Sequence, residues 1–407
     1  MQLTHKIKLN PTLEQRDYFQ KASGTNRFVW NWALAKWKEY YASGKKPNAM
    51  ALKKEFNAIK YKEYPWVKEM HRDSHAQPFA YLARAWNRFF DEIKKNKKAH
   101  EPRFKKKNKS RDSFYVANDK FNVNEKMIRL PKIGFVEMTE SLRFSGKILG
   151  ATVSRHANRW FVAIQVEILD DQASIKRDSD DIKGIDFGIK AAVTLSDGES
   201  IASPRPLKNA LRRLKIRQRS VNRKCKEAKK LLGLKQNELL PKGTRLPVSN
   251  NRKKSSLKLA KLHARIVNLR ADFTHKLTTR FCRENQAIVI EDLNVSGMLK
   301  NEKLARAISD VGFGEIRRQL EYKAKRYDTR LIVANRFYPS SKLCSICDWK
   351  NESLTLKERV WTCQSCGTIH DRDQNAAMNL KRLATINALP VASQTVTNDT
   401  ELEIISI

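Results

Sequence analysis

Four cysteines near the carboxyl end constrain the fold more than any other feature of the chain. Cys344 and Cys347 form one CxxC pair, and Cys363 and Cys366 form a second pair after fifteen intervening residues. Two such pairs can surround one tetrahedral ion with four thiolates, and their spacing is typical of a zinc ribbon. Because the shell is closed, we predict one structural zinc per chain; a redox dithiol and an iron–sulfur cluster are the alternatives.

The charge balance indicates a polyanionic partner. The 407 residues include 81 Lys and Arg against 43 Asp and Glu, a formal net charge of +38. A chain this basic repels itself unless a polyanion neutralises it. We find no terminal basic amphipathic helix with a clean apolar face, as a membrane surface would require. Nucleic acid is therefore the favoured partner, and a basic enzyme without a polyanionic partner is the alternative.

Length and hydropathy indicate a globular protein of two or three domains. No apolar run approaches the roughly 18 residues of a membrane span, and the N-terminus lacks the pattern of a secretory signal. We therefore expect a cytoplasmic protein without membrane contact. The two remaining cysteines, Cys225 and Cys282, stand alone and are expected to have no metal role.

The N-terminal part changes its hydrophobic period twice. Residues 1–10 alternate as a strand does, residues 11–98 carry aromatic side chains at helical spacing, and residues 113–170 return to short strands. The aromatic stripes are expected to form a core. The strands could close a small β-barrel, into which the helical module would be inserted.

A basic run over residues 94–111 links the helical module to the strands. Pro102 interrupts it, and its polarity excludes a place in the core. A solvated linker is one interpretation, and contact with phosphates is the one we favour. The candidate contacts are Arg103, Lys105, Lys106 and Lys107.

The C-terminal part alternates strands and helices. Beyond a polar linker at 171–181, the sequence predicts a hairpin at KGIDFGIKAAVTLSDGE and two long basic helices within 207–285. The apolar strand AIVIEDLNV, a helix in 302–328, the strand TRLIVANRFYPS and a helix at DRDQNAAMNLKRL follow. The Ser/Thr-rich end, from about residue 390, is predicted to be disordered.

Carboxylates end two of the predicted strands. Asp186 lies on the first strand of the hairpin beside Gly188, which permits close approach of backbone or phosphate. A simple turn, or the first hairpin of an actin-like ATPase, would look similar. Glu291 ends the apolar strand, where a carboxylate is costly unless it meets a metal or a cation. A helix-capping or solvent-facing acid is the alternative for Glu291. Asp292 should point to the opposite face.

Two further acids, Asp371 and Asp373, precede the last helix, and either could be its N-cap. Combined with Asp186 and Glu291, an acid at this position would complete the ligand set of a two-metal nuclease. Carboxylates are hard oxygen ligands for Mg²⁺. Two such ions would activate water and stabilise the leaving oxygen of a phosphodiester.

Three of these segments, KGIDFG, VIEDLNV and HDRDQNAAMNL, with the cysteines between the last two, resemble the RuvC-like nuclease of TnpB proteins. Those proteins are encoded by bacterial and archaeal insertion sequences and are related to type V CRISPR effectors. The segments SSLKLAKLHARIVNLRADFTHKLTTRF, PRFKKKNKSRDSF and KIKLNPTLEQ extend the resemblance to about residues 1–385.

The resemblance implies an α/β multidomain fold. A RuvC-like ribonuclease-H fold would occupy 182–335 and 368–388, with a nucleic-acid-binding zinc ribbon inserted at 336–367. A wedge β-barrel would comprise 1–10 and 99–175 and carry a helical recognition domain at 11–98. Residues 389–407 would be a disordered tail.

The function implied by the resemblance is RNA-guided cleavage of DNA. An omega RNA would pair with double-stranded target DNA, and the protein would read a short target-adjacent motif. Asp186, Glu291 and Asp373 would be the catalytic acids, holding two Mg²⁺ ions. Asp373 is preferred to Asp371 because related effectors retain the Asp just before x-N-A-A. Gln77 matches a motif-reading Gln of the family. A monomer associated with the nucleoid is favoured.

Two other functions use similar residues. A strand-joining transposase or recombinase shares the acidic metal chemistry, so the carboxylates alone do not exclude it. A nuclease-inactive, RNA-guided DNA-binding repressor would be expected to lose one or more of the three acids. This chain keeps all three, which favours the nuclease.

Overall fold

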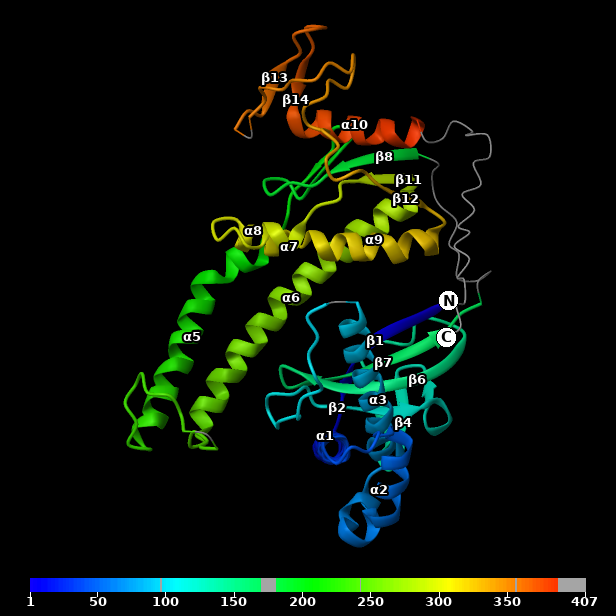
Figure 1. Cartoon of the computed structure of the whole chain (residues 1–407), viewed down its shortest axis with the longest axis vertical. Coiled ribbons are helices and arrows are strands. Elements are labelled where there is room, and N and C mark those ends of the chain that lie inside the picture. The colour runs from blue at the N-terminus through cyan, green and yellow to red at the C-terminus, as the bar shows by residue number, and fades with distance from the viewer. Residues whose placement is uncertain (96, 170–180, 242, 356, 387–407) are drawn as a thin grey trace, which may run out of the picture. The chain divides into compact units, whose positions relative to one another are not determined.

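The computed structural model describes residues 1–95, 97–169, 181–241, 243–355 and 357–386. The chain divides into two compact units, Met1–Ala173 and Ser174–Ile407 (Figure 1). In these described ranges, no helix combines the length and apolarity needed to cross a membrane. The predicted linker, except Asp181, and the predicted tail at 389–407 lie outside the described residues.

The N-terminal unit is built on one antiparallel sheet of seven strands. One face of each long strand is buried, with Ile7, Val153 and Val162 fully enclosed in the core, as the two-residue period of a half-buried strand requires. The order is β2-β6-β7-β1-β5-β4-β3. The strands are β1 (Gln2–Asn10), β2 (Ser113–Ala117), β3 (Asn122–Asn124), β4 (Met127–Leu130), β5 (Gly134–Met138), β6 (Lys147–His156) and β7 (Arg159–Glu167).

The predicted closed barrel is wrong, because the sheet is open between β2 and β3 in the part of the chain that is described. The free edge of β2 is covered by the helical insertion. The backbone N–H of Ala117 donates to Asp73 Oδ2 at 2.7 Å, and Nε2 of His71 lies 3.0 Å from the carbonyl oxygen of Tyr115. Side chains of the helices thus occupy edge groups that barrel closure would have paired with another strand.

The helical insertion enters between β1 and β2, as predicted. It consists of α1 (Leu13–Ala42), α2 (Ala49–Glu63), the short helix η1 (Pro65–Glu69) and α3 (Arg72–Lys94). Thr12 and Gln15 start α1 with a capping box. The aromatic stripes form the core of this insertion, which confirms their structural interpretation. Its buried members include Trp30, Phe56, Phe79 and Trp86.

The C-terminal unit contains a mixed five-stranded sheet with the order β10-β9-β8-β11-β12. Strands β8, β11 and β12 are parallel, and β9 and β10 continue the sheet antiparallel to β8. The SDG turn, residues 196–198, joins β9 to β10, whereas residues 187–192 join β8 to β9. The strands are β8 (Asp181–Asp186), β9 (Val193–Leu195), β10 (Ser200–Ile201), β11 (Asn285–Ile290) and β12 (Arg330–Val333).

Helices cover both faces of this sheet (Figure 1). Ile288 and Ile290 of β11 pack in the core that α6 and α9 share, whereas Ala287 and Val289 pack against α10 on the other face. The two long basic helices form as predicted and lie antiparallel. The helices are α5 (Pro206–Lys230), α6 (Asn250–Glu284), α7 (Val295–Met298), α8 (Ala305–Val311), α9 (Phe313–Tyr327) and α10 (Arg372–Ile386).

The segment between β12 and α10 contains the cysteines and a small hairpin of its own. Strands β13 (Val360–Thr362) and β14 (Ile369–Asp371) pair antiparallel, and the second cysteine pair lies in the loop between them. The chain therefore leaves the main sheet at β12, forms the cysteine-containing segment, and returns as α10 against β8.

Candidate active site and metal centre

Asp186 and Glu291 lie at the same edge of the sheet. In the parallel pairing of β8 with β11, Ile185 is opposite Ile290, so the next residue of each strand is one of the two acids. The hydroxyl of Ser340 donates to Glu291 Oε1 at 2.8 Å. Carboxyl ends of parallel strands are where open α/β sheets place their functional side chains.

The first turn of α10 supplies the third carboxylate, and the structure gives different positions to its two acidic candidates. Oδ1 of Asp371 accepts hydrogen bonds from the backbone N–H groups of Asp373 and Gln374, both at 3.0 Å. Asp371 is therefore the cap of the helix. Asp373 lines the same cavity as Asp186. α10 can lie this close to β8 because Gly184 has no side chain; a Cβ there would fall 1.9 Å from the carbonyl oxygen of Ala377.

That cavity has a volume of about 700 Å³ and is rich in cations. Glu291 lines a separate, smaller hollow of about 120 Å³, although its charge acts on Asp186. A cavity lined by three acids, Asp186, Asp310 and Asp373, and by more basic residues suits a phosphate backbone that meets a metal. Its basic lining residues are Lys190, Arg205, Lys208, Arg306, Arg359 and Arg372.

Burial raises the pKa of both acids at this strand edge, Asp186 and Glu291, and neighbouring acids add to the effect at Asp186. Burial, followed by the charges of Glu291 and Asp373, raises the pKa of Asp186 well above its usual range, with Arg372 and Arg359 opposing. Burial also raises the pKa of Glu291, and the hydrogen bond from Ser340 opposes it. Carboxylates crowded away from water favour a bound cation, because a cation removes both the repulsion and part of the desolvation cost.

Arginines hold Asp373 in place. Nη1 of Arg359 lies 3.1 and 3.2 Å from the two carboxylate oxygens, and Nη2 of Arg372 lies 3.2 Å from Oδ1. Neither arginine was predicted as a site residue. Arg372 could have been found from its position beside Asp373, whereas Arg359 comes from the cysteine-containing segment and becomes visible only in the fold. Ser340 was likewise not predicted, because its contact with Glu291 becomes visible only in the fold.

The carboxylate of Asp292, the residue after Glu291, is paired with two arginines. Its carboxylate accepts from Arg317 and, at 2.6 Å, from Nη2 of Arg336. The two guanidinium groups hold the pKa of Asp292 below its usual range. Of the two acids in VIEDLNV, Asp292 is thus occupied by an ion-pair network, whereas Glu291 accepts a hydrogen bond only from Ser340 among the described residues.

The four predicted zinc ligands converge. Their sulfur atoms lie within 4.8 Å of one another, and theirs is the one such convergence of ligand side chains among the described residues. Sγ of Cys344 lies 3.6 Å from that of Cys366, and Sγ of Cys347 lies 3.5 Å from that of Cys363. Tetrahedral zinc with bonds of about 2.3 Å separates its sulfurs by about 3.8 Å. The site therefore fits a four-thiolate metal such as zinc.

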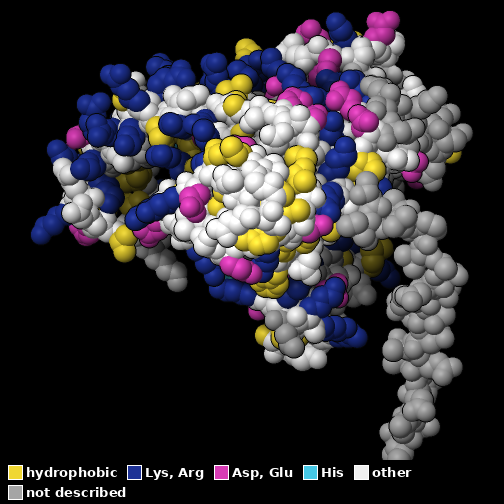
Figure 2. Space-filling view, turned by 90° about the horizontal axis from the view of Figure 1, so that it is seen from above, with side chains coloured by type: hydrophobic (Ala, Val, Ile, Leu, Met, Phe, Trp, Pro, Cys, Tyr) yellow, Lys and Arg dark blue, Asp and Glu magenta, His cyan; other side chains and the backbone are white. Residues whose placement is uncertain are grey.

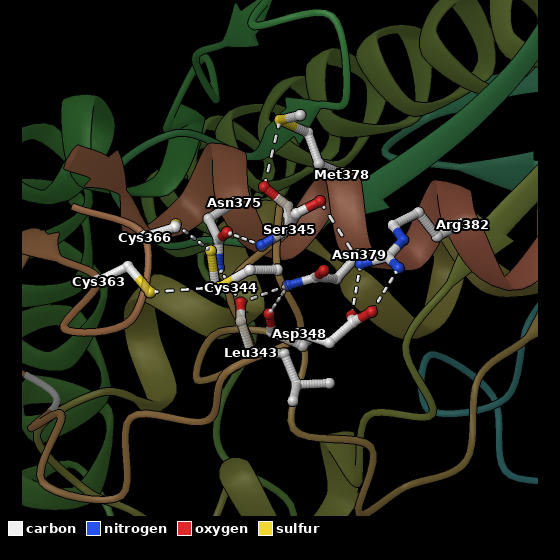
Figure 3. A network of polar contacts seen from close by, with 12 residues as sticks. Leu343, Cys344, Ser345, Asp348, Cys363, Cys366, Asn375, Met378, Asn379 and Arg382 are labelled. Carbon is white, nitrogen blue, oxygen red and sulfur yellow. Dashed lines mark hydrogen bonds and ion pairs between the residues drawn. The ribbon is translucent and has the colours of Figure 1, made fainter. Parts of the chain in front are cut away.

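Side chains of α10 bind the backbone of the first cysteine pair (Figure 3). Asn375 donates to the carbonyl oxygen of Leu343 at 2.6 Å and accepts from the N–H of Ser345 at 3.0 Å. Asn379 donates to the same carbonyl at 2.7 Å. The helix that carries Asp373 in its first turn is thereby hydrogen-bonded directly to the proposed zinc site.

The candidates in the N-terminal unit differ in exposure. Gln77 is half-buried on α3, followed by Pro78 within the helix. Lys105 is half-buried against an aromatic ring. Its ammonium lies 3.9 Å from the ring centre of Trp30, and burial lowers the pKa of Lys105 to about 8. The exposed candidates are Arg103, Lys106 and Lys107.

The fold and the site place this chain in the class of mixed α/β proteins that carry acidic and basic side chains at the carboxyl ends of their parallel strands. Three family models match: "Helix-turn-helix domain" at residues 1–46, "Probable transposase" at 163–302, and "Cas12f1-like, TNB domain" at 313–380. The fold is similar to that in a structure of a Cas12f1-sgRNA-target DNA complex, with a TM-score of 0.51 and 14% identity over 91% of this chain and 83% of that one.

Sequence relatives span nearly the whole chain. A "Putative RNA-guided DNA endonuclease" of Streptomyces pristinaespiralis is 36% identical over 92% of this chain and 87% of its own length. The protein InsQ of Escherichia coli K12, described in the same words, is 29% identical over 92% and 90%. The chain belongs to the family of these proteins, the TnpB family.

Proposed function

We propose that this protein is an RNA-guided, Mg²⁺-dependent DNA endonuclease of a transposable element. The observation that carries the proposal is the register of β8 against β11, which brings Asp186 and Glu291 to one edge while α10 brings Asp373 to the cavity at Asp186. We assign a RuvC-like ribonuclease-H fold to this sheet and its helices, and the role of catalytic acids to the three carboxylates.

The carboxylates suit magnesium because they are hard oxygen donors, with Asp186 and Asp373 in a cationic cavity and Glu291 at the end of the strand beside that of Asp186. Bound there, two Mg²⁺ ions would supply an activated water and stabilise the leaving oxygen. The protein's own groups orient the site: Ser340 fixes the Glu291 carboxylate, and Arg359 and Arg372 fix Asp373. The four remaining cations are proposed to receive the phosphates of the strand: Lys190, Arg205, Lys208 and Arg306.

The guide and target are proposed to be an omega RNA and double-stranded DNA bearing a short target-adjacent motif. Support comes from the relatives described as RNA-guided DNA endonucleases and from the net charge of +38. A heteroduplex is read through its backbone, which suits a strongly basic surface. Gln77, Arg103, Lys106 and Lys107 are proposed contacts of the N-terminal unit, and the cysteine-containing segment a contact of the target. Lys105 is better explained by its contact with Trp30.

The direct test is Asp186→Ala in the complex purified with its guide RNA. Co-purified RNA is sequenced to define the guide, and a plasmid library with the matching target and randomised flanks is then incubated with Mg²⁺. The wild type is expected to cut, and the variant to bind the same RNA but lose cleavage, because a metal ligand is missing. Cleavage by the variant at the wild-type rate would contradict the assignment.

The same assay separates the alternatives. A linear plasmid with no joined ends is expected of an endonuclease, whereas covalently joined ends would indicate a strand-joining transposase. Guide-dependent binding without cleavage by the wild type would indicate a repressor. The chain keeps all three candidate catalytic acids, which favours the first outcome.

A further inference from the structure

Helices α5 and α6 pack as an antiparallel pair whose contact changes character along its length. Near the catalytic cavity the contact is apolar, with Ala210 and Leu214 of α5 packed on Leu262 and Ile266 of α6. This is the ordinary way in which two amphipathic helices associate. The pair then continues well beyond this apolar cluster (Figure 1).

Past the apolar cluster, the facing positions become cationic or small. Arg217 comes three residues after Leu214, and Ser255 comes four residues before Leu259, so both continue the stripe that had been apolar. They line a groove of about 380 Å³ between the helices, together with Arg213, Ser220, Lys224 and Lys258 and one apolar residue, Ile216. On α5 these positions follow the spacing i, i+3, i+4, i+7 and i+11 and therefore share one face.

The groove has no internal compensation for its charge. None of its lining residues is acidic, and within the described ranges Arg213, Arg217, Lys224 and Lys258 form no ion pair. α5 as a whole carries eleven basic residues and one acid. Figure 2 shows Lys and Arg side chains crowded at the left of the view, where α5 and α6 extend, with few carboxylates among them. Like charges facing one another across a groove oppose the helix pairing unless a polyanion lies between them.

One helix, α5, contributes residues to both the groove and the catalytic cavity. Lys208, at the start of α5, lines the cavity, and Arg213 lines the groove. Five residues of helix separate them by about 7.5 Å, and Lys224 lies about 24 Å beyond Lys208. Asp310 fixes the start of α5 by accepting from the N–H groups of Leu207 and Lys208, both at 2.9 Å. The helix is thus firmly tied to the cavity wall.

From this shared helix and the uncompensated charge of the groove, we infer that the α5–α6 groove binds the single DNA strand that passes through the catalytic cavity, by its sugar–phosphate backbone. The groove has the volume of a small-ligand pocket, so it holds one backbone at a time. Serines at its floor leave room, and cations from both helices flank it, as in sequence-independent single-strand sites. The identification of the strand rests on the proposed nuclease function; the presence of a polyanion site does not.

The test is binding of a fluorescent single-stranded DNA, without a match to the guide, by the protein–guide RNA complex at several salt concentrations. In Arg213→Gln/Arg217→Gln/Lys258→Gln, affinity at 0.1 M salt is expected to fall at least about tenfold. The slope of log affinity against log salt should decrease by about 2, since three phosphate contacts are lost at about 0.7 each. Ser220→Glu, a single change on the same face, should weaken binding in the same direction.

A matched control removes three charges elsewhere. Lys46→Gln/Lys54→Gln/Lys62→Gln changes three exposed lysines of the N-terminal unit and should leave single-strand affinity within about twofold and the slope unchanged. Unchanged DNA affinity in the groove variants would overturn the inference. So would a selective loss of guide RNA with DNA binding retained, which would make the groove an RNA site. Neither result depends on cleavage, so a failure here is distinct from a failure of the Asp186→Ala test.

Discussion

Arg382 of α10 forms a two-pronged ion pair with Asp348, the residue after Cys347. Two guanidinium nitrogens of Arg382 lie 2.5 and 2.7 Å from the carboxylate oxygens. This contact lies nine residues beyond Asp373 on the same helix. The cysteine-containing segment is therefore attached to α10 at both ends of its first knuckle, by Asn375 near the start of the helix and by Arg382 further along. Loss of order in that segment should reach Asp373.

Cys344→Ser is expected to remove the metal and loosen the attachment of α10. The wild type should contain about one zinc per chain, and the variant much less, because three thiolates no longer close the shell. Thermal stability and guided cleavage should both fall although no catalytic acid is changed. Metal analysis, thermal unfolding and plasmid cleavage are the measurements.

The control for that variant is Cys225→Ser, since Cys225 lies outside the cluster. It should retain zinc and activity. Full cleavage and unchanged thermal stability in Cys344→Ser would indicate that the zinc site is dispensable.

Asn375→Ala tests the hydrogen bonds between α10 and the first cysteine pair without changing a metal ligand. Its side chain is 1% exposed, and truncation leaves the N–H of Ser345 without its acceptor. Such a loss costs about 1–3 kcal/mol. We expect zinc content to stay at one per chain while cleavage falls several-fold, because α10 is less well held. Asn57→Ala, on the exposed side of α2, is the control; equal activity in both variants would contradict the link.

Glu291→Gln and Asp292→Asn are neighbouring changes with opposite expectations. Glu291→Gln should reduce guided cleavage at least about a thousandfold, since it removes a negative charge at the metal site. Asp292→Asn should keep cleavage within about tenfold, because Asp292 serves Arg317 and Arg336 instead. Initial rates at saturating Mg²⁺ compare the two. The reverse ranking would show that the strand end is assigned to the wrong acid.

Gly184→Ala should disrupt the packing of α10 on β8. The new methyl carbon would lie 1.9 Å from the oxygen of Ala377 and 2.5 Å from the nitrogen of Lys381, both backbone atoms that cannot move aside alone. We expect a loss of ~3 kcal/mol in unfolding free energy, at the upper end for overpacking, together with lost cleavage. Gly314→Ala meets no atom within 4 Å and should change stability by less than ~1 kcal/mol. Urea unfolding measures both.

The N-terminal unit should lose stability in mild acid through His75. Burial, followed by the charge of Lys60, lowers the pKa of His75 to about 4. In the unfolded chain His75 is therefore protonated below about pH 6.5, whereas in the folded chain it stays neutral down to about pH 4. Stability is full above pH 6.5 and falls as the pH decreases, by roughly 2 kcal/mol between pH 7 and pH 5.

Tryptophan fluorescence suits this measurement, because six of the eight tryptophans lie in residues 1–173. His75→Gln should flatten the pH dependence of urea unfolding even if it lowers stability at neutral pH. An unchanged slope in the variant would assign the acid sensitivity to other groups.

The spacing of residues along the sequence was enough to predict the cysteine cluster, the helical insertion and the acids that end the strands. Paired CxxC spacing requires a small knuckle wherever it occurs, so the ligands of a metal site could be named in advance. Aromatic residues at helical spacing could be assigned to a core, because an amphipathic stripe must be buried. The preference for Glu291 over Asp292 rested on the desolvation cost of an acid that ends a buried strand and on strand alternation.

Only the tertiary structure decided how these pieces meet. The sheet stays open because Asp73 and His71 occupy the edge of β2, and no strand pattern shows what a distant helix will cover. Arg359 reaches Asp373 across the hairpin of β13 and β14, and the α5–α6 groove arises where two separate basic helices align. Period and spacing act between near neighbours in the chain, whereas packing selects which distant side chains touch.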